Sequence, residues 1–153
     1  MKFMPSDSTV FVDTNVLLYA QDPRTPDKQR DAAQWLNWCW RGQRGRISSQ
    51  VLHELYVNLR KVAPTLVPEQ ARDVVRRYRR WRPWSVDDAT VDHAWALQDE
   101  TGYSYWDCLM LAAALQQGCR YLLTEDLQHE HLIDSMRIIN PFRSLPIDLG
   151  LPE

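Results

Sequence analysis

The sequence predicts an α/β fold in which helices cover a mostly parallel β-sheet. Residues 9–13 and 120–124 are continuous apolar runs, which is typical of strands that are buried on both faces. Segments with helical spacing separate these runs, and such alternation favours parallel pairing of the strands through helical crossovers. No internal repeat, low-complexity tract or linker divides the chain, so we expect a single domain over residues 1–153.

The elements follow in order from their apolar spacing. Strands are expected at residues 9–13, 46–48, 84–86, 120–124 and 136–139. Helices are expected at residues 15–20, 27–41, 50–61, 68–81, 85–101 and 104–118. Residues 126–134 are expected to form a turn or a short helix, and the proline-spaced tail from Pro141 is expected to pack along the surface.

Prolines, glycines and capping residues set the ends of the first three helices. Residues 22–23 and 25–26 are Asp-Pro and Thr-Pro pairs, which break the first helix. Gly42 and Gly45 follow the second helix and end it. Ser49 is the candidate N-cap of the third helix, because serine accepts a hydrogen bond from a free backbone N–H there.

The later helices carry similar signals. Pro64 ends the third helix, and Pro68 fits the first turn of the fourth. Residues 85–88, Ser-Val-Asp-Asp, can act as a capping box for the fifth helix, and Gly102 follows its end. The sixth helix begins at Ser104, and Gly118 closes it.

The composition is that of a globular protein in water, with 44% hydrophobic and 25% charged residues. No apolar run is as long as a membrane span, and the start of the chain, MKFMPSDS, turns polar too early for a signal peptide. The three cysteines form no C-x-x-C pair and are odd in number, which indicates a reducing cytoplasm and unreactive thiols.

The net charge of −2 hides an asymmetry along the chain. Residues 41–82 hold 11 of the 18 basic residues and three acids, whereas residues 83–153 hold 12 of the 20 acids and three basic residues. A polyanion-binding surface beside an acidic pocket would produce this division. Charged helix faces that are simply solvated would produce it as well.

Two acids directly follow predicted buried strands. Asp13 ends the run VFVD, and Asp126 lies just after the run YLLT. The carboxyl ends of parallel strands meet at one edge of an α/β sheet, where binding sites form. Burial of an unpartnered carboxylate is costly, so Asp13 requires a metal ion, a cation or several hydrogen-bond donors.

Two further acids could reach the same edge of the sheet. Glu54 lies off the apolar stripe of its helix, near the beginning, and could equally face water. Asp107 lies in the first turn of an almost wholly apolar helix, where the helix dipole favours negative charge. Capping explains Asp107 as well, because Ser104 precedes it by three residues. Asp126, considered by itself, could equally be a loop residue or the N-cap of a helix.

Four carboxylates in one crevice repel one another and need neutralisation. An all-oxygen ligand set suits Mg²⁺ or Mn²⁺ rather than zinc. Such ions can activate a water molecule and stabilise the leaving oxygen of a phosphodiester. Hydrolysis of a nucleic-acid backbone is therefore the reaction that this set of acids predicts.

These acids and their surroundings resemble the PIN domain. The resemblance is carried by Asp13 in VDTN, Glu54 in QVLHEL, Asp107 in YWDCL and Asp126 in TEDL, and it extends over residues 9–141. The chain looks most like the VapC-like ribonuclease toxins of type II toxin–antitoxin systems. The resemblance implies a three-layer α/β/α sandwich with a mostly parallel five-stranded sheet.

The resemblance also implies a site, a cofactor and partners. The four acids would bind Mg²⁺ or Mn²⁺ and cleave RNA, while Asn15 and Thr124 would support Asp13, Asp126 or a bound water. A cognate antitoxin protein and a homodimer are the implied partners. Family members often have a glycine soon after the EDL segment, where this chain has His129 and Glu130.

The histidines and acids around Asp126 allow two interpretations. Glu125, His129 and His131 are expected to be surface residues. Alternatively, one of them or Glu130 tunes the metal or contacts RNA.

The stretch RDVVRRYRRWRPW, residues 72–84, has six arginines in its first 11 positions. Arginine pairs with phosphate through two hydrogen bonds and stacks on bases, so the stretch predicts an RNA-binding surface. The candidates are Arg76, Arg77, Arg79 and Arg80. The alternatives are a solvated helix face whose arginines pair with the acidic C-terminal half of the chain, or a docking surface for an acidic antitoxin segment.

The remaining tryptophans are expected in the core or in an interface rather than as platforms for RNA bases. They are Trp35, Trp38, Trp40, Trp95 and Trp106.

Two other functions remain open from the sequence. A catalytically silent PIN-like module would bind RNA or a protein without cleaving it. A phosphatase with a nucleophilic aspartate usually needs a second acid two residues later, and Asn15 occupies that position.

Overall fold

The computed structural model describes residues 8–152, so the polar start of the chain falls largely outside it. The strands are β1 (Val10–Val12), β2 (Gly45–Arg46), β3 (Tyr121–Leu123), β4 (Leu132–Ile133) and β5 (Met136–Ile139). The α-helices are α1 (Thr14–Tyr19), α2 (Pro26–Gly42), α3 (Ser49–Val62), α4 (Pro68–Tyr78), α5 (Asp88–Thr101) and α6 (Tyr105–Gln116). Two 3₁₀ turns, η2 (Arg79–Trp81) and η3 (Pro146–Leu149), complete the structure.

The five strands form one mostly parallel sheet in the order β2-β1-β3-β5-β4, as expected. β1 lies between β2 and β3 and is parallel to both, with Phe11 opposite Arg46 on one side and Leu122 on the other. β3 is parallel to β5. Because β1 and β3 are neighbours in register, the residues that follow them emerge at the same edge of the sheet.

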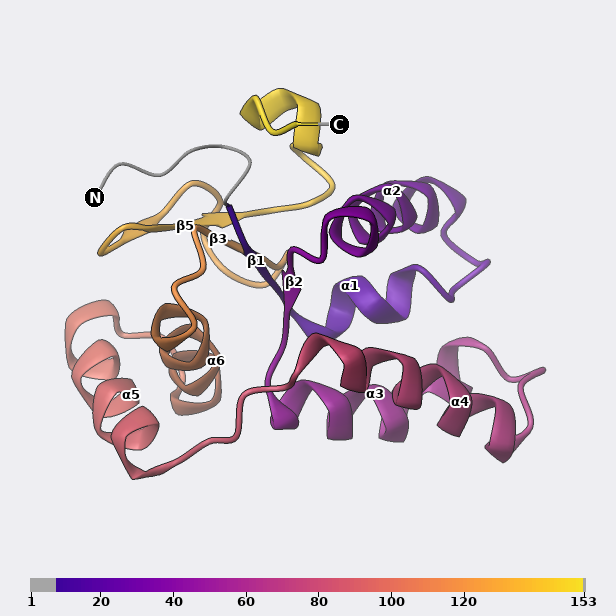
Figure 1. Ribbon diagram of the computed structural model, residues 1–153, viewed down its shortest axis with the longest axis horizontal. Helices are drawn as coiled ribbons and strands as arrows, with labels where there is room; N and C mark the ends of the chain where they lie inside the picture. Colours follow the sequence, from indigo (N-terminus) through magenta and orange to yellow (C-terminus); the bar gives the residue numbers. More distant parts are fainter. Residues whose placement is uncertain (1–7, 153) are drawn as a thin grey trace.

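Helices cover the sheet in layers. In Figure 1, α5 and α6 lie together on one side of the strands, while α1, α2, α3 and α4 gather on the other. β1 and β3 are buried along their whole length, and so are residues 108–114 of α6. The apolar runs of the sequence are therefore continuous because their residues are enclosed on all sides. No helix within residues 8–152 is long and apolar enough to cross a membrane.

Several helix ends differ from the expectation by one or a few residues. Ser48 rather than Ser49 is the N-cap of α3, and it makes no side-chain capping bond. Asp87 rather than Ser85 caps α5, because its side chain accepts a hydrogen bond from the backbone N–H of Thr90 at 2.9 Å. The fourth helix changes to a 3₁₀ turn at Arg79 before it ends at Trp81. Ser104 is the N-cap of α6, as expected.

Two strand expectations were wrong in extent or type. Residues 84–86 form no strand, and only an isolated bridge joins Trp84 to Ser48. Residues 126–134 contain β4, which pairs antiparallel with β5, where a turn or helix was expected. β4 has two residues, one exposed and one buried, so it gives no periodic signal in the sequence.

The proline-spaced tail packs on α2 through two tryptophans. The indole N–H of Trp35 donates to the carbonyl of Ser144 at 2.9 Å, and that of Trp38 donates to the carbonyl of Pro152 at 2.6 Å. Both tryptophans are buried in the core, as expected from the sequence, and their N–H groups find partners as buried indoles require.

Gly45 is required where β2 passes over a cluster of aromatic rings. A Cβ atom on Gly45 would lie 2.5 Å from the ring of Trp81, which is itself packed between Trp40 and Tyr78 at centroid distances of 5.2 and 5.0 Å. We therefore expect Gly45→Ala to lower the free energy of unfolding by roughly 1–3 kcal/mol, because the rings cannot move freely. Urea unfolding of the variant measures this loss.

Gly42→Ala is the matched control for that variant. The atoms nearest to its added Cβ belong to the far end of the Arg44 side chain, which can shift at little cost although its guanidinium lies 4.7 Å from the centroid of the Trp38 ring. We expect its stability to lie within about 0.5 kcal/mol of that of the unmodified chain. Equal losses of unfolding free energy in Gly45→Ala and Gly42→Ala would contradict the explanation that the Cβ atom at position 45 clashes with the ring of Trp81.

Candidate active site

All four predicted acids line one small pocket at the carboxyl ends of β1 and β3. This acid pocket has a volume of about 130 Å³, and the acids that line it are Asp13, Glu54, Asp107 and Asp126. The other lining residues are Gln50, Val51, Trp106 and Met110. No lysine or arginine lines the pocket, and within residues 8–152 none of the four acids forms an ion pair with either. The negative charges are therefore left without a cationic side chain to balance them.

Asp13 is held at the junction of β1 and α1. Its Oδ1 accepts from the backbone N–H of Thr14 at 2.7 Å, which caps α1, and its Oδ2 accepts from the hydroxyl of Thr124 at 2.8 Å. Burial raises the pKa of Asp13 to about 6, the two hydrogen bonds lower it in part, and the charges of Asp126 and Glu54 add to the rise. Asp13 lies between the last residue of β1 and the first residue of α1, so its carboxylate is at the edge of the sheet where the strand ends and the helix begins.

Asn15 joins Asp13 to Asp126. Its side-chain amide lies 3.5 Å from Oδ2 of Asp13 and donates to Oδ2 of Asp126 at 3.0 Å, so the two carboxylates approach the same nitrogen atom. The amide also lies 3.3 Å from the hydroxyl of Thr124, which accepts from the backbone N–H of Asp126 at 3.1 Å. Asn15 and Thr124 thus contact both acids.

Glu54 turns toward the pocket from α3. Its Oε2 accepts from the hydroxyl of Thr14 at 2.7 Å, and its Oε1 accepts from the side-chain amide of Gln50 at 3.0 Å. Glu54 is half-buried rather than solvated. The bond to Thr14 connects Glu54 to the residue whose backbone N–H donates to Asp13, so α1 and α3 fix the two acids relative to each other.

Asp107 lies in the first turn of α6 and lines the pocket. Its backbone N–H donates to the hydroxyl of Ser104, the N-cap, at 3.2 Å, and that hydroxyl donates back to Oδ2 of Asp107 at 2.8 Å. Ser104 therefore caps α6 with Asp107 as its partner, and this pairing does not exclude a role for Asp107 in the site.

The side chains of the pocket suit a divalent cation in their chemistry but not in their present arrangement. Within residues 8–152, no three acid, histidine or cysteine side chains are arranged so that they could hold one metal ion. The amide of Asn15 and the hydroxyl of Ser104 occupy carboxylate oxygens that an ion would need. The donor chemistry does fit, because the ligands are all oxygens, they lack cationic partners, and the side-chain oxygen of Asn15 is buried without a hydrogen bond.

The residues around Asp126 are more engaged than expected of surface residues. Glu125 accepts from the hydroxyl of Tyr19 at 2.6 Å and from the ammonium of Lys28 at 2.7 Å, and it is half-buried. Nδ1 of His129 accepts from the backbone N–H of Asn140 at 2.9 Å, and Nδ1 of His131 lies 2.7 Å from the hydroxyl of Tyr103. None of these side chains lines the acid pocket. They brace the loop that carries Asp126.

Glu130 adopts a backbone conformation that is uncommon for a residue other than glycine. Its φ angle is +67°, in the left-handed region that favours glycine. A glutamate therefore occupies a position in the turn before β4 where a glycine would be less strained.

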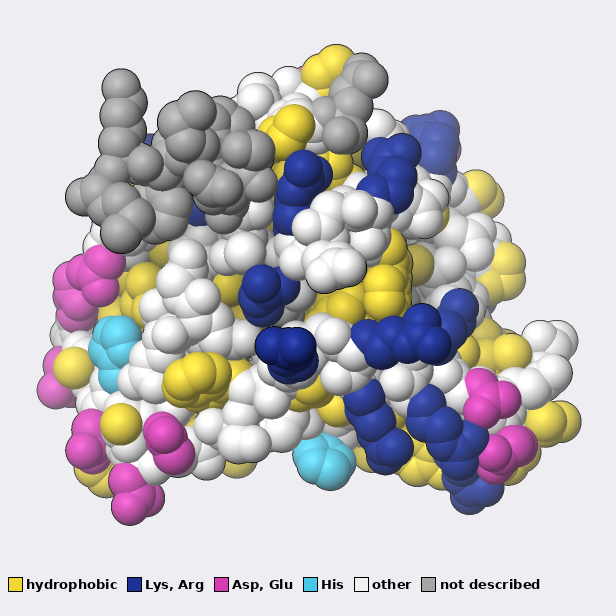
Figure 2. Space-filling view, viewed as in Figure 1, with side chains coloured by type: hydrophobic (Ala, Val, Ile, Leu, Met, Phe, Trp, Pro, Cys, Tyr) yellow, Lys and Arg dark blue, Asp and Glu magenta, His cyan; other side chains and the backbone are white. Residues whose placement is uncertain are grey.

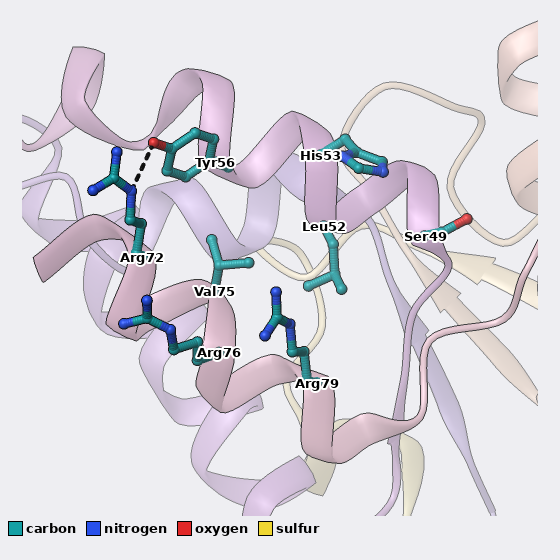
Figure 3. Close-up of a pocket in the computed structure, with 8 residues that line it drawn as sticks. All are labelled: Ser49, Leu52, His53, Tyr56, Arg72, Val75, Arg76 and Arg79. Atoms are coloured by element: carbon teal, nitrogen blue, oxygen red, sulfur yellow. Dashed lines mark hydrogen bonds between the residues drawn. The ribbon is translucent and has the colours of Figure 1, made fainter. Parts of the chain in front are cut away.

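The arginine stretch is divided between two surfaces. A groove of about 390 Å³, which we call the arginine groove, lies between α3 and α4. Figure 3 shows Leu52 and Val75 between the two helices, Arg72 and Arg76 on α4, and Arg79, the first residue of η2, beside them. Arg80 lines a different cavity with Arg46 and Arg82, and Arg77 is exposed but lines neither. Figure 2 shows basic side chains gathered over α3 and α4, with acids toward α5.

Ion pairs already occupy part of the arginine groove. Arg76 donates to Glu69 at 2.6 Å and to Asp73 at 2.7 Å, and Arg72 lies 3.4 Å from Glu69 and donates to the hydroxyl of Tyr56 at 3.2 Å. The charges of α4 are therefore balanced partly within α4, rather than by the acidic second half of the chain.

The sequence interpretation missed two lining residues of the acid pocket and one residue that holds Glu54. Gln50 lines the pocket and precedes Glu54 by one helical turn, so their spacing could have placed both on the same face of α3. Thr14 carries the hydroxyl that bonds Glu54, and no motif marks it. Trp106, expected in the core or in an interface, is not in the core, since it is 64% exposed, and it lines the pocket.

The comparisons with known proteins agree with this arrangement. The profile of the family described as "PIN domain" matches residues 10–133 and so includes all four acids of the pocket. A chain of a toxin–antitoxin complex from Klebsiella pneumoniae is 20% identical, with a TM-score of 0.63, over 88% of this chain and 98% of that chain. No curated protein sequence matches the chain.

A second solved structure, VapBC2 from Rickettsia felis bound to a DNA fragment from its promoter, contains a chain with 16% identity. Its TM-score is 0.55, and the match covers 85% of this chain and 96% of that chain. At these identities, the likeness to both structures shows a shared fold.

Proposed function

We propose, on the premise that this chain belongs to the PIN domain family, that it is a metal-dependent endoribonuclease that hydrolyses RNA phosphodiester bonds. The observation that carries the proposal is the acid pocket, in which four carboxylates from separate segments of the chain converge without a balancing lysine or arginine. An isolated cluster of this kind is unfavourable at neutral pH, and a bound cation relieves the repulsion. We take residues 1–153 as one such nuclease domain.

Mg²⁺ or Mn²⁺ is the proposed cofactor, held by Asp13, Glu54, Asp107 and Asp126. When bound, such an ion lowers the pKa of a water molecule and stabilises negative charge on the leaving oxygen. The chain orients the acids through fixed hydroxyl donors: Thr124 holds Oδ2 of Asp13, and Thr14 holds Oε2 of Glu54. The hydrogen bonds of Asn15 and Ser104 to Asp126 and Asp107 would have to be exchanged when an ion binds.

RNA is the proposed substrate, with part of its phosphate backbone bound outside the acid pocket. The N-terminal half of α3 separates two cavities: Gln50 and Glu54 face the acid pocket, whereas Ser49 and His53 face the arginine groove. Of the predicted RNA contacts, Arg79 lies in this groove and forms no ion pair with any residue between 8 and 152, and Arg76 is held by Glu69 and Asp73. Arg77 and Arg80 would contact RNA only from other parts of the surface.

A role as the toxin of a type II toxin–antitoxin module is the biological context that we propose. The resemblance of the four motifs and the shared fold with chains of two toxin–antitoxin structures support it. A cognate antitoxin, a homodimer and a cytoplasmic location belong to the same proposal. Growth arrest on expression, relieved by co-expression of a small neighbouring reading frame with a DNA-binding N-terminus, would support the toxin role.

Divalent ions are expected to stabilise the chain and to be required for cleavage. At an ion concentration of about 100 times Kd, we expect Mg²⁺ or Mn²⁺ to raise Tm by roughly 5–10 °C, because the ion removes repulsion present only in the folded state. Internal cleavage of single-stranded RNA should appear with the same ions and stop with EDTA. An equal rise in Tm with K⁺ at matched ionic strength, or cleavage that continues in EDTA, would contradict the proposal.

A further inference from the structure

We infer that Trp106 binds a base of single-stranded RNA by stacking, beside the phosphodiester that the acid pocket would cleave. The inference rests on the proposed function and adds how the substrate is held. Trp106 lines the acid pocket next to Asp107, and it is 64% exposed. Most large apolar side chains of this chain are enclosed, so a solvent-facing indole at the pocket is a notable exception.

The other tryptophans show that this exposure is unusual for an indole of this chain. Trp35, Trp38 and Trp81 are 0%, 2% and 6% exposed, and Trp40 and Trp84 pack against the core. Of the tryptophans, only Trp95 is comparable, at 56% exposed, and it does not line the acid pocket; the aliphatic side chains that are as exposed, Val57 and Ile147, do not line it either. Exposure of an indole to water costs hydrophobic stabilisation, which a ligand would restore by covering the ring.

The ring is carried on a rigid part of the fold. Trp106 lies in the first turn of α6, and the residues that follow, 108–114, are fully enclosed by the core. The ring of Tyr105 approaches it with an interplanar angle of 64° at a centroid distance of 5.4 Å. The helix therefore fixes the position of the indole, while a large part of its surface remains accessible to a flat ligand.

The charge of the pocket explains why a base contact would be needed. Four acids and no basic side chain line it, so a phosphate group has no side-chain cation to bind there. A bound metal supplies one ionic contact, and the arginine groove lies on the other side of α3. Val51 and Met110 extend the apolar wall beside Trp106. Stacking on that wall would add affinity that does not depend on charge.

Stacking also defines the substrate class. Every base has a π-face, so an indole platform accepts any sequence, and it requires a base that is not paired in a helix. The site therefore selects unpaired RNA over duplex RNA. Sequence preference must come from contacts other than Trp106.

The test compares binding of two fluorescent probes that differ only in their bases. One is a short single-stranded RNA of mixed sequence, and the other has abasic riboses throughout. Both are titrated by fluorescence anisotropy with Mn²⁺ present, in an Asp126→Asn background that prevents cleavage. We expect Trp106→Ala to weaken binding of the RNA about 5- to 100-fold and to leave binding of the abasic probe within about twofold. Trp106→Phe, which keeps a flat ring, should retain most of the affinity, and Trp95→Ala should match the parent.

The outcomes of the binding test and of the cleavage assay distinguish failure of the stacking inference from failure of the proposed nuclease function. Equal binding of RNA by the parent and Trp106→Ala would overturn the inference, and so would equal losses for both probes. Conversion of a dimer to a monomer by Trp106→Ala, seen by sedimentation, together with equal losses, would assign Trp106 to a subunit interface instead. Absence of cleavage by the unmodified chain would refute the proposed nuclease, while the binding comparison would still decide the role of Trp106.

Discussion

Asp13→Asn is expected to reduce RNA cleavage by roughly 10²–10⁴-fold without unfolding the chain. The pKa of Asp13 is raised to about 6, by burial first and by the charges of Asp126 and Glu54 second. Asparagine keeps an oxygen that can cap Thr14, so α1 should still begin at the same residue. It removes the negative charge that the proposed ion requires. Initial rates on a fluorescent single-stranded RNA with Mn²⁺ measure the effect.

Asp99→Asn is the matched control, because it makes the same change of charge on the exposed surface of α5. It should cleave RNA at the rate of the unmodified chain. Cleavage by Asp13→Asn within about twofold of that rate would exclude Asp13 from the mechanism. Circular dichroism of both variants shows whether the fold is intact, so a loss of activity through unfolding is recognised.

The placement of Asp13 and Asp126 could be predicted from the sequence because each lies at or close after the end of a continuous apolar run. Such a run indicates a buried strand and the edge of the sheet at which it ends, and the register of β1 with β3 then brings Asp13 and Asp126 together. The edge strand β4 could not be predicted, since two residues carry no periodicity. The fold was thus predictable where burial is complete and not where the sheet meets solvent.

The hydrogen bonds within the site could not be predicted, because they depend on side-chain direction. Helical spacing places Glu54 off the apolar stripe, but only the structure shows that it turns to the hydroxyl of Thr14 rather than to water. Trp106 illustrates the same limit. Composition favours a buried tryptophan, and the chain instead presents this one at the mouth of an acidic pocket.

In a chelating buffer, Asp13→Asn is expected to be more stable than the unmodified chain at neutral and alkaline pH. The pKa of Asp13 is about 6 in the folded chain, against 3.8 as its ordinary value. The folded chain therefore binds this proton more tightly than the unfolded chain. Stability contributed by Asp13 is complete below about pH 4 and is lost as the pH rises through about 6. A shift of about two pKa units corresponds to about 3 kcal/mol.

The measurement is the difference in free energy of unfolding between the two chains, followed by urea titration from about pH 4 to pH 8. Subtraction removes the opposite contributions of Asp22, Glu69 and Asp87, whose pKa values are lowered by hydrogen bonds. We expect the variant to gain about 1–3 kcal/mol relative to the parent over this range. A difference that does not change with pH would contradict the raised pKa of Asp13.

Saturating Mn²⁺ should reverse the order of the two chains at pH 8, if the same carboxylate that destabilises the empty pocket is a ligand of the ion. The unmodified chain gains binding energy in the folded state, whereas the asparagine variant gains little. The chain would then keep a costly buried charge because the ion, and through it the reaction, depends on that charge. If Asp13→Asn is more stable than the unmodified chain both in the chelating buffer and with Mn²⁺, then the raised pKa of Asp13 is unrelated to metal binding.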